Sequence, residues 1–73
     1  MSRLHPKRII KLADKISALY SLCIITEAQK NEMAQSLRRG KAGLDALYAA
    51  SRRLPEHPLV HDLQQEILFG ENY

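Results

Sequence analysis

Apolar residues recur in alternating steps of three and four along the first third of the chain. They are Ile9, Leu12, Ile16, Leu19 and Cys23. This spacing is a heptad seam, whose side chains share one face of a helix. Pro6 suits the first turn, because the N–H that it lacks would have no intrahelical partner there. The pattern predicts a helix of about 18 residues from His5-Pro6, with Cys23 as a small buried residue.

A capping box follows this seam. Thr26 precedes a polar helical stretch, and Gln29 lies three residues further on. In such a box the threonine hydroxyl accepts from the amide of residue 29, and the glutamine side chain reaches back to residue 26. Thr26 is therefore predicted to begin a second helix, after a connection of only a few residues. Connections this short favour antiparallel neighbours, so the first two helices should form a hairpin.

A second seam runs through the basic stretch that follows, and its alternating steps of four and three residues continue without interruption. Its members are Met33, Leu37, Gly40, Leu44, Leu47, Ser51 and Leu54. Unbroken phase favours one long helix over residues 27–54. Gly40 and Gly43 argue against it, because each glycine costs about 1 kcal/mol relative to alanine inside a helix. A break near Gly40 is the alternative.

The last helix follows Pro55, which cannot continue the one before it. His57-Pro58 repeats the His-Pro start of the first helix, and Gly70 is the expected C-cap. The apolar markers of this helix are Leu59, Val60, Leu63, Ile67 and Leu68. Residues 71–73 are expected to form a frayed tail. The predicted fold is all-α, an antiparallel helical hairpin plus a third helix, forming a small three-helix bundle in a single domain over residues 1–73.

Composition places this chain among globular proteins. Of its 73 residues, 45% are hydrophobic and 26% are charged, which is not the balance of a disordered chain. A single cysteine excludes an internal disulfide and fits a reducing compartment. There is no apolar run near the roughly 20 residues that span a membrane, and no signal-peptide pattern. We expect a cytoplasmic protein.

Charge is distributed unevenly along the chain. Residues 1–53 contain all 11 Lys and Arg with four acidic residues, whereas residues 54–73 contain the other four acidic residues. Such asymmetry points to a charged partner or to contacts between the two parts. In a hairpin, the lysines of the first helix come level with the basic stretch at residue 40. The candidate contacts for a protein or nucleic acid are Lys7, Lys11, Lys15, Arg38, Arg39 and Lys41; a solvated face is the alternative.

The sequence contains no set of residues whose types and spacing are typical of a catalytic or metal-binding site. His57 and His61 are spaced to share a helix face, but two ligands do not make a zinc site. Their simpler interpretation is as residues of a helix start, with His57 as an approximate cap. We expect no enzyme activity, no metal and no cofactor.

The segment "EMAQSLRRGKAGLDALY", residues 32–48, is similar to helix-turn-helix DNA-binding segments. In this resemblance Met33, Ala34 and Leu37 are core positions of the first helix. Leu44 and Leu47 are those of the recognition helix. The family's turn glycine and buried turn hydrophobe fall on Arg38 and Arg39. The groove-facing positions offer Gly43, Asp45 and Ala46 rather than residues that read bases.

The hairpin with "LRRG" at residues 37–40 resembles the small co-chaperones of type III secretion, which pair with a larger helical chaperone. The resemblance covers residues 8–54 and implies a bacterial-type small protein that holds another helical protein.

The function predicted first is a non-enzymatic adaptor or chaperone that contacts another helical protein or a second copy of itself. The seams offer more apolar surface than two short helices can bury. Ile10, Tyr20, Ile24 and Tyr48 flank the seams and are candidates for an apolar interface. The alternative is a basic, dimeric regulator that binds DNA or RNA. No contact with a membrane or a small molecule is expected.

Overall fold

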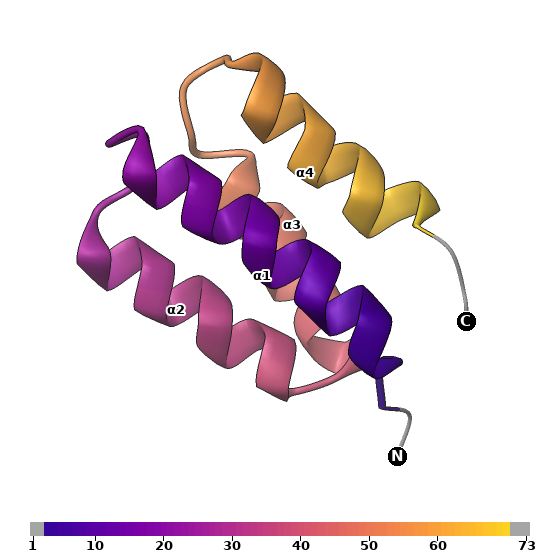
Figure 1. The fold of residues 1–73 in the computed structure, drawn as a ribbon. Coiled ribbons are helices and arrows are strands. Elements are labelled where there is room, and N and C mark those ends of the chain that lie inside the picture. The colour runs from indigo at the N-terminus through magenta and orange to yellow at the C-terminus, as the bar shows by residue number, and fades with distance from the viewer. Residues whose placement is uncertain (1–2, 71–73) are drawn as a thin grey trace.

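The computed structural model describes residues 3–70, and these residues form four α-helices without a strand (Figure 1). The helices are α1 (Pro6–Ser21), α2 (Glu27–Arg38), α3 (Lys41–Ser51) and α4 (Pro58–Phe69). The predicted all-α class is confirmed, but the bundle has four helices rather than three. The expectation for residues 71–73 lies outside the described residues.

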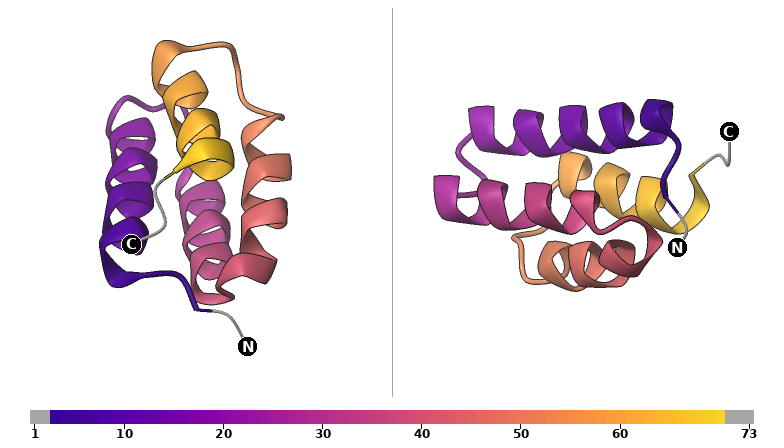
Figure 2. Two further views of the ribbon diagram at one scale, coloured as in Figure 1. Left: turned by 90° about the vertical axis from the view of Figure 1, so that its right-hand side faces the viewer. Right: turned by 90° about the horizontal axis from the view of Figure 1, so that it is seen from below.

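The four helices form a closed ring around one core. Each helix packs against the next one in the chain, and α4 packs against α1. Figure 2 shows α1 and α3 on opposite sides of the bundle, with α2 and α4 between them. The predicted α1–α2 hairpin is present, and the bundle measures 32 × 21 × 18 Å. Its radius of gyration of 11.1 Å matches the value of about 11 Å expected for a compact chain of this length.

Helix α1 ends earlier than its seam predicts. The N–H of Cys23 donates to the Tyr20 carbonyl, and that of Ile24 donates to the Leu19 carbonyl. This pair of bonds is a Schellman motif, which requires a left-handed residue after the C-cap. Cys23 occupies that position with φ 60°. The prediction that Cys23 is buried in the seam is therefore wrong, because the residue lies beyond the helix and is exposed.

The predicted starts of α1, α2 and α4 are confirmed. The Thr26 hydroxyl accepts from the Gln29 amide, and the Gln29 side chain accepts from the Thr26 amide, which completes the capping box. Both His-Pro pairs also begin helices. In each pair the imidazole Nδ1 accepts from the backbone N–H two residues on, at Lys7 in α1 and at Leu59 in α4. His57 is thus the cap that its position indicates.

The favoured single helix over residues 27–54 is wrong, and the alternative break at Gly40 is correct. Gly40 has φ 70° and ψ −145°, a backbone conformation that is essentially restricted to glycine. Only Arg39 and Gly40 separate α2 from α3. The seam keeps its phase because each helix turns its own apolar face to the same core: Met33, Leu37 and Leu47 are all buried.

The core is aliphatic and takes residues from all four helices. Its fully enclosed side chains include Leu12 and Leu19 of α1, Met33 of α2, Leu47 of α3 and Leu63 of α4. The seams therefore cover one another within the chain. No helix among residues 3–70 is both long and apolar enough to cross a membrane.

Candidate functional site

Two lysines of α1 face α4. Lys15 forms an ion pair with Asp62. Lys11 and Lys15 line a groove between the two helices, together with Asp62 and Glu66 of α4. Lys7, one turn before Lys11, is exposed. Part of the charge asymmetry is therefore satisfied within the chain, between basic α1 and acidic α4.

The other predicted basic residues lie at the turn between α2 and α3. Arg38, Arg39 and Lys41 are all exposed. Lys41 lines a groove between α3 and α4, whereas Lys11 and Lys15 line the groove between α1 and α4. Lys11 and Lys15 thus line a different groove from Lys41. The hairpin does bring α1 level with the turn, but Lys11 and Lys15 face α4 instead of α2.

Arg8 is the residue that the sequence interpretation missed. It is only 7% exposed, and its Nη2 donates to the carbonyls of Glu66 and Ile67, at 3.3 and 3.0 Å. A cation at a helix C-terminus interacts favourably with the unpaired carbonyls and the helix dipole. The signal was present in the sequence, because Arg8 lies four residues before Leu12 and extends the apolar seam.

The four apolar interface candidates do not form one face. Ile10 is 60% exposed and lies two residues from both Arg8 and Leu12, on the side of α1 away from the core. Tyr20 lies beside α2, with the Lys30 ammonium 4.3 Å from its ring centre. Ile24 and Tyr48 are partly buried against the core.

Apolar side chains that sequence reasoning did not select are also exposed. Leu22 lies at the end of α1, and Leu68 and Phe69 lie at the end of α4. Leu68, one of the apolar markers of the last helix, is 50% exposed. It lies one position after buried Ile67, where the helix has turned away from the core.

The groove between α3 and α4 combines apolar and charged residues. Its volume is about 580 Å³. Partly buried Leu44 and Tyr48 lie on the α3 side, and Leu68 lies on the α4 side. The remaining lining residues are Arg8, Lys41, Asp45, Ile67 and Gly70. In this groove an apolar wall lies beside basic residues.

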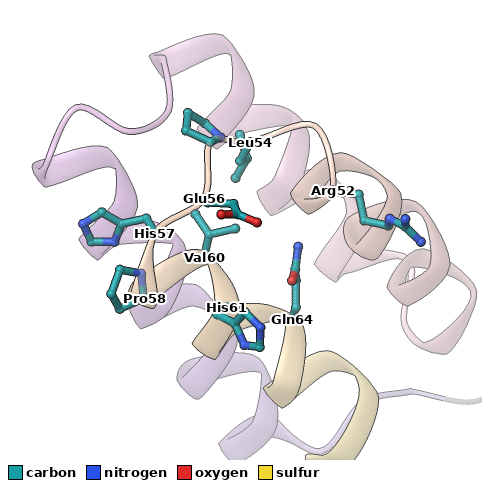
Figure 3. A pocket seen from close by; sticks show the side chains of 9 residues that line it. Arg52, Leu54, Glu56, His57, Pro58, Val60, His61 and Gln64 are labelled. Atoms are coloured by element: carbon teal, nitrogen blue, oxygen red, sulfur yellow. The ribbon is translucent and has the colours of Figure 1, made fainter.

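A second pocket, of about 650 Å³, lies under the loop between α3 and α4. Figure 3 shows that the imidazoles of His57 and His61 project in different directions around this loop. His57 is already engaged as the cap of α4. Within residues 3–70, no group of three His, Cys, Asp or Glu side chains is placed to hold a metal ion. This pocket therefore has volume for a ligand, but its two histidines do not form a metal-binding group.

Comparison with known proteins adds nothing to this geometry. No protein-family model, no curated protein and no solved structure matches the chain.

Proposed function

We propose that this chain is a small, non-enzymatic protein-binding module of the adaptor or chaperone type. The observation that carries the proposal is the α3–α4 groove, where Leu44, Tyr48 and exposed Leu68 form an apolar surface beside Lys41. Partner helices and extended segments bind such grooves by placing apolar anchors in them. A basic rim increases association rate and selectivity for an acidic partner.

The groove replaces the seams as the basis for this proposal. The seams were expected to remain partly uncovered, but α3 and α4 cover them within the chain. A partner that bound the seams would have to open the core. A partner that bound the groove would bury the exposed Leu68 side chain. No contact within the core would have to be broken.

The test compares two exposed leucines at different ends of the bundle. Tagged wild-type chain, Leu68→Asp and Leu22→Asp would be used to isolate partners from the source cell, with chemical crosslinking and mass spectrometry. The proposal expects a protein that Leu68→Asp loses and Leu22→Asp retains, with crosslinks to Lys41. Equal recovery with all three chains would contradict it.

Binding to nucleic acid is the second candidate, and the break at Gly40 is the observation that favours it. The two-residue turn joins α2 to α3 and exposes Arg38, Arg39 and Lys41. Other features oppose it. Ala34, a core position in the helix-turn-helix resemblance, is exposed, and the outer face of α3 offers Ala42, Asp45 and Ala46.

Salt dependence separates the two candidates. Binding to duplex DNA through phosphates weakens with salt, with a slope of about −0.9 in log K per phosphate neutralised. Fluorescence anisotropy with a labelled random duplex, at several salt concentrations, measures this slope. The charge-reversing pair Arg38→Glu and Arg39→Glu would abolish such binding, while contact in the α3–α4 groove would only form more slowly.

A further inference from the structure

We propose that the α3–α4 groove takes the side-chain carboxylate of an acidic partner segment, held by Arg8 and Lys41 beside the apolar wall. This inference rests on the proposed protein-binding function and names the chemistry of the partner. The occupant is a segment in which one Glu or Asp has an apolar neighbour. The carboxylate would lie against the two cations, and the apolar side chain would pack on Leu44, Tyr48 and Leu68.

The first argument is an unsatisfied donor. The Arg8 residue is only 7% exposed, yet its Nε–H has no hydrogen-bond partner among the described residues. Buried polar groups are normally hydrogen-bonded, and an unpaired donor of a charged group is the more costly kind. Nη2 is occupied by the end of α4. The guanidinium is therefore fixed in place with a donor left over, and it lines the groove.

The second argument is the arrangement around this donor. Gly70 also lines the groove, and a Cβ on it would lie 3.1 Å from Arg8 Nε. A side chain at position 70 would therefore press against Nε, which is already enclosed. The Glu66 carboxylate also lies beside Gly70, but it makes no ion pair with Arg8 in the part of the chain described. A partner carboxylate at Arg8 would thus compete with Glu66 for the same cation.

The third argument concerns the number of anionic groups that fit. Arg8 and Lys41 supply two positive charges, while Asp45 lies one turn along α3 in the same groove. Both cations line the groove that a carboxylate would enter. A row of phosphates along α3 would meet Asp45, and like charges repel in such a groove. The groove therefore fits an acidic peptide better than a nucleic acid backbone.

The test uses a matched pair of capped peptides, acetyl-Leu-Glu-Leu-Ala-amide and its glutamine counterpart, titrated into the ¹⁵N-labelled full chain by NMR. We expect shifts of the Arg8 Nε–H and of the Leu44, Tyr48 and Leu68 amides. The glutamate peptide should bind about tenfold more tightly than the glutamine peptide, since a charge-assisted hydrogen bond is lost.

Variants of the chain make the assignment specific without touching Arg8, whose loss could unfold the bundle. Lys41→Gln should weaken the glutamate peptide several-fold, and Arg38→Gln, an exposed cation outside the groove, should leave it unchanged. Glu66→Gln should strengthen binding, because it removes the competing carboxylate. Equal affinity for both peptides, or no gain with Glu66→Gln, would overturn the carboxylate site.

These outcomes are separable from failure of the proposed function. If both peptides shift the groove amides equally, the groove binds protein segments and only the carboxylate inference fails. If neither peptide shifts them while a DNA duplex does, both proposals are wrong and the nucleic-acid candidate stands.

Discussion

Gly43 of α3 lies directly against the backbone carbonyl of Ser36 in α2, with no room for a side chain between them: a Cβ built at position 43 would overlap this oxygen. The two glycines of the basic stretch therefore have different roles. Gly40 allows the turn through its backbone conformation, and Gly43 allows the two helices after the turn to approach each other.

Gly43→Ala is expected to destabilise the fold. In an open helix the change would add about 1 kcal/mol of stability, but here the methyl group must push α3 away from α2, at a cost of about 1–3 kcal/mol from overpacking. Urea unfolding would measure the difference. The control is Ala46→Gly on the exposed face of α3, which should cost about 1 kcal/mol. A more stable Gly43→Ala chain would show that the close approach is not maintained.

Cys23→Gly is expected to stabilise the protein. Cys23 has a positive φ at the C-terminal motif of α1, where a residue with a Cβ is disfavoured by about 1 kcal/mol. The melting temperature would rise by several degrees for a domain of this size. Cys23→Ser removes the thiol and keeps the Cβ, so it should show little change. Cys23→Val, with a β-branched side chain, should lower the melting temperature.

Arg8→Met is expected to be among the most destabilising changes of a basic residue. Methionine keeps much of the apolar stem but leaves the carbonyls of Glu66 and Ile67 without their buried donor, at a cost of about 1–3 kcal/mol. Arg38→Met, an exposed residue in the last turn of α2, is the matched control. It should cost only a few tenths of a kcal/mol, from its interaction with the helix dipole. Equal losses would refute a capping role for Arg8.

The ion pair between Lys15 and Asp62 is expected to contribute little. The Asp62 side chain is 56% exposed, and exposed pairs are worth less than about 1 kcal/mol. A double-mutant cycle with Lys15→Met and Asp62→Asn would measure the coupling free energy. Raising the salt concentration should reduce it towards zero. A coupling that persisted in high salt would mean that the pair is shielded from solvent.

Local signals in the sequence were sufficient for most of the fold. The capping box at Thr26 and the His-Pro starts depend on neighbours within one or two turns, and all of them are confirmed. The phase of the first seam fails only at Cys23, which lies beyond the end of α1 and is exposed. The break at Gly40 was harder, because two helices that face one core show the same apolar phase as one helix. The phase of the apolar pattern indicates which side chains are buried. It does not indicate whether one helix continues through Gly40.

The candidate site was much less accessible to sequence reasoning. The partners of Arg8 and Lys15 are on α4, 47 or more residues away, and no local pattern specifies such pairs. The expectation that Lys15 and Arg38 share one surface required knowing which side of α1 faces α2. The α3–α4 groove depends on how two helices pack, and its residues are spread from position 8 to position 70.

The closed ring of helices has a consequence for the order of folding. Three of its four contacts join consecutive helices and need only short loops to close, whereas the contact of α1 with α4 joins the two ends of the bundle. Loop-closure entropy makes this last contact the slowest to form by chance. The bonds from Arg8 to α4 would then be absent from the folding transition state. Weakening them would accelerate unfolding and leave the folding rate nearly unchanged, so the α1–α4 contact sets how long the native bundle persists once formed.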